Sequence, residues 1–258
     1  MRPDTEYSEA MRLIASEAEQ EPAWQAYAHY CRERERGLRK QALRSLGAFV
    51  GTAERWTFEA RLSFVAWLCA HLERPGWARF DLTPHPLTNR ILRPTLEEWT
   101  THDPQAPLPH RWLGMFFGYS YSGVRAGLVE PPDSVEQHLR RAIELDPTEQ
   151  PARVRLAERL IGGLEYDAHH LPEHYIGEAE NDVGVAEEAA HLIEGITDPD
   201  DRDRLRGELA AAQQLLEDWL AFSLEPGTDF DEWCRLRGRH YVWTKHYYYG
   251  GGHFDSLD

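Results

Sequence analysis

The sequence predicts an all-α protein in which antiparallel helix pairs stack as a helical repeat, preceded by a helical N-terminal subdomain. Apolar residues recur at intervals of three and four along most of the chain. No segment shows the alternation of a β-strand flanked by turns, and prolines and glycines separate the periodic segments. Nine Trp, eleven Tyr and nine Phe among 258 residues argue against disorder, because so much aromatic surface has to be buried.

Four helices are predicted in the first hundred residues, at 5–19, 22–50, 54–73 and 88–102. The third is apolar on nearly every side, so we expect it to be central and buried. Residues 74–87 contain three prolines and are predicted to form an ordered loop.

A domain boundary is predicted at residues 103–109, where three of seven residues are proline. The charge balance changes at the same place. Residues 1–103 hold 14 basic and 15 acidic residues, whereas residues 104–258 hold 14 basic and 29 acidic residues. The sequence therefore predicts an N-terminal helical subdomain over 1–103 and an acidic helical-repeat region over 104–258.

Three amphipathic helices and a capping helix are predicted in the second part. Their apolar faces are Val135, Leu139, Ala142 and Ile143; Val154, Ala157, Ile161 and Leu164; and Leu205, Leu209, Ala212, Leu216 and Trp219. The second is expected to end near Gly162–Gly163, and the third, spanning 201–222, follows the N-terminal signal Asp198–Pro199. Trp233, Leu236, His240, Trp243 and Tyr247 also have helical spacing and are expected to cap the stack.

The pattern Leu139-x-x-Ala142-x4-Pro147, followed by Leu156–Ala157, resembles a tetratricopeptide repeat. Trp112-Leu113-Gly114 with Phe117 resembles a degenerate first helix of such a repeat. The prolines that would close two successive repeats, Pro147 and Pro199, are 52 residues apart, whereas a regular repeat has 34 residues. The difference predicts about 18 extra residues within 163–181. The resemblance covers about 109–224 and implies stacked antiparallel helix pairs with a groove and an interaction role. Residues 1–103 resemble no family.

A His-rich segment within the expected insertion is a candidate metal site. Its candidate ligands are Asp167, His169, His170, Glu173 and His174. Pro172 makes a continuous helix through His170 and His174 unfavourable, and there is no HExxH pattern or Cys pair. We therefore favour a structural role in hydrogen bonding, with no cofactor, and keep a metal-dependent hydrolase as the alternative.

Arg235 and His240 form a second candidate pair, because Arg-x4-His resembles the short motif of the HEPN ribonucleases, which are also all-α. That resemblance implies metal-independent acid–base cleavage of RNA. The acidity of the surrounding sequence opposes RNA binding. The arginine-rich stretch over 32–44 is interleaved with Glu33 and Glu35, so we expect it to form a solvated helix face with ion pairs.

The free cysteines and the apolar pattern bear on location. Cys31, Cys69 and Cys234 are widely spaced and form no CxxC pair, so buried thiols in a reducing cytosol are expected. No apolar run is long enough to span a bilayer, and the first residues lack the apolar core of a secretory signal. The predicted location is cytoplasmic.

The distribution of charge is the strongest indication of a partner. Residues 160–201 contain no Lys or Arg but twelve Asp and Glu, in a chain of net charge −16. Such a span attracts basic proteins and repels nucleic acid and membrane surfaces. The predicted partner-binding residues are Glu178, Glu180, Asp182, Glu187 and Glu188. The predicted function is a non-enzymatic protein-binding module, in its sharper form an immunity-like or antitoxin-like protein that masks a basic partner such as a nuclease.

Overall fold

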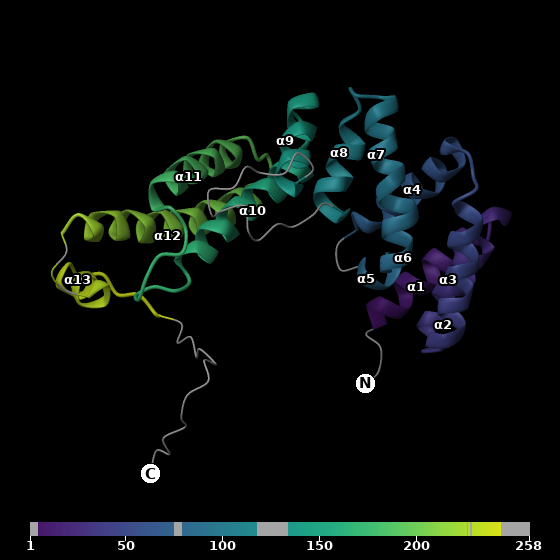
Figure 1. The fold of residues 1–258 in the computed structure, drawn as a ribbon, viewed down its shortest axis with the longest axis horizontal. Coiled ribbons are helices and arrows are strands. Elements are labelled where there is room, and N and C mark those ends of the chain that lie inside the picture. Colours follow the sequence, from purple (N-terminus) through teal and green to yellow (C-terminus); the bar gives the residue numbers. More distant parts are fainter. Residues whose placement is uncertain (1–4, 75–78, 118–133, 226, 228, 244–258) are drawn as a thin grey trace, which may run out of the picture. The chain divides into compact units, whose positions relative to one another are not determined.

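A computed structural model describes residues 5–74, 79–117, 134–225, 227 and 229–243, which form helices and no β-strand (Figure 1). The predicted all-α fold is confirmed for these residues. Within the same ranges, every helix falls short of the length or the apolarity that a membrane span requires. The described chain divides into two compact units, unit 1 up to residue 148 and unit 2 from residue 149 onward.

Unit 1 is built from helices that pack mainly on their neighbours in sequence. They are α1 (Thr5–Ala18), η1 (Pro22–Trp24), α2 (Gln25–Glu35), α3 (Arg39–Ala53), α4 (Phe58–Leu72), α5 (Arg79–Leu82), α6 (His85–Leu87), η2 (Thr88–Leu92), α7 (Arg93–His102), α8 (Pro107–Trp112), η3 (Leu113–Phe117) and α9 (Val135–Leu145). Of these, η1 is a 3₁₀ turn and η2 and η3 are π-helical segments.

An aromatic cluster forms the centre of unit 1. The ring of Tyr27 lies 5.1 Å from that of Phe64, which lies 4.7 Å from that of Phe49, so α2, α3 and α4 meet there. The Tyr27 hydroxyl donates a hydrogen bond of 2.7 Å to the carbonyl of Leu82 and so is satisfied although it is fully buried. Because Phe64, Val65 and their neighbours on α4 are buried, the predicted central position of this helix is confirmed.

The prediction of one continuous helix over 22–50 is wrong, because α2 ends at Glu35 and α3 begins at Arg39. Gly37 has φ +74°, the left-handed conformation that glycine adopts without a steric penalty. The amide of Leu38 donates to the carbonyl of Glu33, and the amide of Gly37 donates to that of Arg34. This is the Schellman arrangement that ends a helix, so α2 stops and α3 begins in a new direction.

The proline-rich segments also contain helix. Within the predicted loop 74–87, the described residues include the short helices α5 and α6. In the predicted boundary segment 103–109, α7 ends at His102 and α8 begins at Pro107, a first-turn position where proline needs no amide partner. Both helices belong to unit 1 and pack against each other.

A close approach brings η3 and α9 together in unit 1. A Cβ atom added to Gly114 would lie 2.6 Å from Cγ of Leu139, so the helices can touch only because residue 114 has no side chain. Leu139 and Ala142 are fully buried on the same face of α9. These residues were those that carried the resemblance to a repeat, and they form the contact between consecutive helices that it implies.

Unit 2 contains α10 (Gln150–Ala168), α11 (Ala179–Glu194), α12 (Pro199–Ser223) and α13 (Phe230–Leu236). The side chain of Gln150, at the start of α10, donates to the carbonyl of Gly195 and accepts from the amide of Thr197, just after the end of α11. These contacts make α10 and α11 antiparallel. The short turn to α12 then gives an up-down-up arrangement in which α12 contacts both preceding helices.

The predicted apolar face of α12 is confirmed for Leu205, Leu209 and Leu216, which are buried, whereas Ala212 and Trp219 on the same predicted face are half-buried. The predicted end of α10 is wrong. This helix continues through Gly162 and Gly163 to Ala168, since Gly163, Leu164 and Asp167 lie on its buried face. The residues 163–181, where an insertion was predicted, form the end of α10, the connection 169–178 and the start of α11.

The three cysteines are free and buried, as predicted. Burial raises the pKa of the Cys31 thiol to about 12 and that of the Cys234 thiol to about 11. The thiolate is the reactive form, so both side chains remain protonated and inert near neutral pH.

Candidate functional site

The acidic helix α11 has two distinct faces. The buried face consists mostly of small and aliphatic residues: Ala179, Ala186, Ala189, Leu192 and Ile193. The exposed face carries Glu180, Val183, Gly184, Glu187, His191 and Glu194, which recur at helical intervals. Glu180 is in the first turn, where the positive end of the helix dipole stabilises a carboxylate. The sequence thus forms a stable helix while presenting negative charge outward.

Three carboxylates on this face, Glu180, Glu187 and Glu194, lie apart from the basic residues that the structure describes. Among the residues that the structure describes, no ion pair involves Glu180, Glu187 or Glu194. Because residues 160–201 contain no Lys or Arg, a partner could come only from another element. Among the described residues, the charges of Glu180, Glu187 and Glu194 are therefore not neutralised by an ion pair. We call Glu180, Glu187 and Glu194 the α11 carboxylates.

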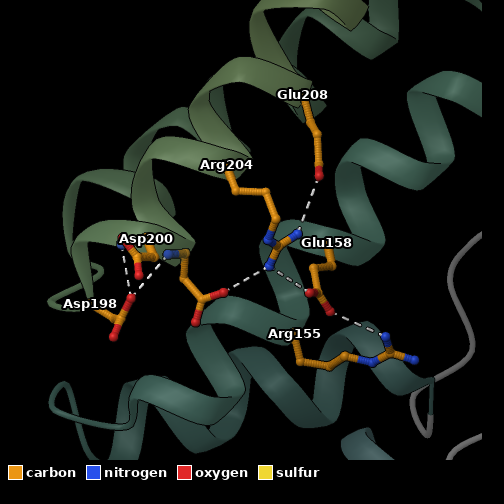
Figure 2. A network of polar contacts seen from close by, with 7 residues as sticks. Arg155, Glu158, Asp198, Asp200, Arg204 and Glu208 are labelled. Atoms are coloured by element: carbon orange, nitrogen blue, oxygen red, sulfur yellow. Dashed lines mark hydrogen bonds and ion pairs between the residues drawn. The ribbon is translucent and has the colours of Figure 1, made fainter.

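The neighbouring helices show the opposite arrangement (Figure 2). Arg204 of α12 contacts Glu158 of α10 at 3.0 Å, Asp201 at 2.9 Å and Glu208 at 3.3 Å. Arg155 contacts the other oxygen of Glu158 at 3.3 Å. Arg204 is therefore paired with carboxylates of both α10 and α12, and Arg155 is paired with Glu158 of its own helix.

The N-terminus of α12 is capped by Asp198, which lies near the ion pairs of Arg204 (Figure 2). The carboxylate of Asp198 accepts hydrogen bonds from the amides of Asp200 and Asp201, at 2.9 and 3.0 Å. This N-cap satisfies two amides that have no partner within the helix, and it ends the turn from α11. The predicted N-terminal signal at Asp198–Pro199 is thereby confirmed.

The five predicted partner-binding residues do not share one environment. Glu178, Glu180 and Glu187 are exposed and Glu188 is half-buried. Asp182 is buried and accepts a hydrogen bond of 2.6 Å from the hydroxyl of Tyr175. Because Asp182 is buried, it does not belong to the exposed acidic face. Its hydrogen bond with Tyr175 instead joins the connection 169–178 to α11.

The five candidate metal ligands lie at the end of α10 and in the connection after it. Asp167 is fully buried on the last turn of α10, whereas Glu173 and His174 are exposed. The rings of His169 and His170 are 4.3 Å apart, and those of His170 and His174 are 4.8 Å apart. Nδ1 of His169 contacts the carbonyl of Tyr166, one turn earlier in α10.

The described part of the chain contains no group of three or more His, Cys, Asp or Glu arranged to hold a metal ion. The contacts made by this segment instead join it to the helices around it. The amide of Ile176 donates to the carbonyl of Asp167 at 2.8 Å, and Leu171 is buried against the aromatic residues of α12 and α13. This arrangement fits the structural role that we favour for the His-rich segment.

Arg235 and His240 are on different structural elements. Arg235 is exposed on α13 and pairs with Asp231 at 3.2 Å. His240 is exposed beyond the end of that helix. No hydrogen bond or ion pair joins the two side chains, both of which are described. The prediction that one helix continues from Trp233 through Trp243 is wrong, because Gly238 has φ +70° and ends α13. Tyr247, the last residue of that predicted helix, lies outside the described residues.

The arginine-rich stretch is a largely exposed surface with ion pairs, as predicted, but the pairs are not with its own glutamates. Arg32 contacts Glu19 of α1, and Arg34 contacts Asp81 of α5. Glu33 instead accepts a hydrogen bond from Ser45. These contacts connect helices of unit 1.

Two groups of polar residues could not be recognised from the sequence. Nδ1 of His110 lies 3.1 Å from Nδ1 of His138, joining α8 to α9 across 28 residues of sequence. The second group is formed by Asp218 and Asp231, which accept hydrogen bonds from Tyr241 and Trp243. No sequence motif links these positions, because the fold alone brings them together.

Comparisons with known proteins found no match. No protein-family profile matches the sequence. No curated protein matches it. No solved structure matches it.

Proposed function

We propose that the chain is a protein-binding module whose α11 carboxylates capture a basic protein partner. The observation that carries this proposal is the exposure of Glu180, Glu187 and Glu194 on a helix face without a basic residue. An unneutralised field of one sign attracts partners of the opposite sign, accelerates their encounter and repels nucleic acid and anionic membrane surfaces.

The architecture of unit 2 supports the same proposal. Helices α10, α11 and α12 alternate in direction and pack in sequence order, as in tetratricopeptide repeats. Stacked helical hairpins present rigid helix faces, which are suited to recognition because little conformational entropy is lost on binding. The contrast with the charge-paired surface of α10 and α12 makes α11 the face that a basic partner would select.

A capture experiment with matched variants tests this proposal. The immobilised wild-type protein, a Glu180→Lys/Glu187→Lys variant and a Glu9→Lys/Glu21→Lys control are incubated with the same cell extract, and retained proteins are identified. Both variants change the net charge equally, but Glu9 and Glu21 are exposed in unit 1. We expect a basic protein to be retained by the wild type and the control and lost from the α11 variant. Equal retention by all three would refute the role of α11.

In its sharper form, the proposal gives the chain an immunity-like or antitoxin-like role in which it masks a basic enzyme. Acidic complementarity suits this role, since it speeds capture and fixes the register of the complex. The test uses the captured protein after purification. Stoichiometric inhibition of its enzymatic activity, relieved by high salt, is the expected result; full activity in the saturated complex would leave a binding role without masking.

A further inference from the structure

A short segment after α13 folds back onto acidic side chains of unit 2. The amide of Arg239 donates to the carbonyl of Cys234, and that of Gly238 donates to the carbonyl of Arg235. With Gly238 at φ +70°, this is a Schellman turn that ends α13 and redirects the chain. Residues 239–243 then continue without helical structure. We call residues 237–243 the C-terminal strap.

Alternate residues of the strap contact the helices. Nε of Arg239 lies 3.3 Å from Oδ2 of Asp218, which also accepts a hydrogen bond from the hydroxyl of Tyr241. The indole nitrogen of Trp243 donates to Asp231 at 2.6 Å. The intervening Val242 is 99% exposed. This alternation is that of an extended segment laid on a surface, with every second side chain facing the protein.

The surface under the strap combines two carboxylates with an aromatic floor. Asp218 is buried on α12, and its second oxygen accepts a hydrogen bond of 3.4 Å from Gln214. The ring of Phe230 lies 5.7 Å from that of Trp243 and 5.2 Å from that of Trp219. A buried carboxylate requires donors or a cation nearby, and the strap supplies both. The surface is therefore complementary to a basic and aromatic segment.

The strap is held mainly through its side chains. Residues 240–243 make no backbone hydrogen bond to another described residue. The Arg239 side chain is 45% exposed, so its ion pair with Asp218 is screened by water. Arg237 stacks on the indole of Trp233, with its guanidinium carbon 3.9 Å from the ring centre, at the edge of the same surface. Such contacts order the strap but leave it open to competition.

We propose that the surface formed by Asp218, Asp231 and Phe230 is a recognition site for an extended segment of a partner protein. The segment it fits carries Arg, Tyr and Trp at alternate positions, and the strap occupies the site until the partner's segment replaces it. This site uses α12 and α13 and does not depend on the α11 carboxylates. The strap thus acts as an internal competitor that sets the affinity for the partner.

Peptide binding to the full-length protein tests this proposal directly. The probe is a fluorescent peptide with the sequence RGRHYVW, that of the strap. We expect it to bind a Tyr241→Ala/Trp243→Ala variant about tenfold more tightly than the wild type, because the internal competitor closes most wild-type sites. A peptide with Ser in place of its His and Val should bind equally, since these positions face solvent. A peptide with Ala at the second Arg, the Tyr and the Trp should not bind.

Further variants keep the test decisive. Arg239→Ser/Tyr241→Phe removes both contacts to Asp218 but keeps the aromatic packing, so it provides a folded alternative if the first variant is unstable. Adding Asp218→Asn/Asp231→Asn to either variant should abolish peptide binding. The Glu180→Lys/Glu187→Lys variant should bind the peptide like the wild type, which separates this site from the α11 surface.

Three results would overturn the proposal. The first is that the peptide binds neither strap variant although circular dichroism shows that both variants are folded. The second is that the peptide with Ala at the second Arg, the Tyr and the Trp binds as tightly as the peptide with the strap sequence. The third is a concentration-dependent dimer of the wild type that Arg239→Ser/Tyr241→Phe abolishes, because the surface would then serve exchange between two copies of this chain.

Discussion

Arg204 of α12 and Glu158 of α10 form an ion pair with 3.0 Å between Nη2 and Oε1, and the same guanidinium also contacts two carboxylates of its own helix. One cation therefore serves three anions on this surface. The positive charge of Arg204 is therefore engaged with carboxylates of α10 and α12. Local pairing, and not only composition, determines where the negative charge of the protein is available.

The Arg204–Glu158 pair should contribute little to stability, because both side chains are substantially exposed. A double-mutant cycle with Arg204→Gln and Glu158→Gln should give a coupling free energy of about 0.5 kcal/mol that falls in 1 M salt. The measurement is chemical unfolding of the four proteins. A coupling of several kcal/mol that is insensitive to salt would show that the network, and not the apolar core, holds α10 to α12.

Leu209→Asp should unfold much of unit 2. Leu209 is buried on α12, and an unpaired charge there should cost about 3–5 kcal/mol. Ala210→Asp is the matched control, because Ala210 is exposed on the same helix and should change the unfolding free energy by less than about 0.5 kcal/mol. Thermal and urea unfolding followed by circular dichroism would check both. Equal melting temperatures for the two variants would contradict the assigned core.

Tyr175→Phe should destabilise unit 2 by about 2 kcal/mol. It removes the 2.6 Å hydrogen bond to the buried carboxylate of Asp182, and hydrogen bonds to charged groups typically contribute about 1.5–3 kcal/mol. Tyr166→Phe removes a hydroxyl from a residue that is 49% exposed and should be nearly neutral. The comparison is made by equilibrium unfolding. If Tyr166→Phe cost as much as Tyr175→Phe, the Asp182 contact would not be the cause.

Stability should decrease as the pH falls through the range from 6.5 to 4. Burial, then the neighbouring His138 and Arg141, lowers the pKa of His110 from 6.5 to about 4, while Glu144 opposes this. The unfolded chain therefore binds more protons within that range, and acid favours unfolding. Above pH 6.5 the contribution of neutral His110 is fully present.

Between pH 7 and pH 5 the unfolding free energy should fall by about 1 kcal/mol because of His110, after allowing for solvent screening at this half-buried position. His110→Gln should remove that part of the acid sensitivity in unfolding experiments at several pH values. His29→Gln, at an exposed position, is the control and should keep the wild-type dependence. Identical pH profiles for His110→Gln and wild type would contradict the assignment.

Helical periodicity was sufficient to predict the fold class and most of the residues on the buried faces, because a core face repeats every three or four residues along the chain. Leu139, Ala142, Leu205, Leu209 and Leu216 are buried as that pattern requires. The two missed interruptions have one physical cause. Gly37 and Gly238 each end a helix in the left-handed conformation, although the flanking residues have helical spacing.

Gly162 and Gly163 show why glycine alone does not locate a helix end. There the chain continues as α10, since Leu164 and Asp167 remain on the buried face and no left-handed residue intervenes. The acidic span was evident in the sequence, but its division into faces was not. Asp182 and Glu180 are two residues apart, yet one is buried against Tyr175 and the other is exposed. Only the packing of α11 separates them.

The most direct test of the α11 surface is the rate at which the captured basic partner associates with the protein at different salt concentrations. We expect the association rate constant of the wild type to fall steeply with rising salt. Glu180→Lys/Glu187→Lys should lower it about tenfold at low salt, with a smaller effect on dissociation, while Glu9→Lys/Glu21→Lys should match the wild type. An association rate that is independent of salt and equal in all three proteins would contradict electrostatic capture by α11.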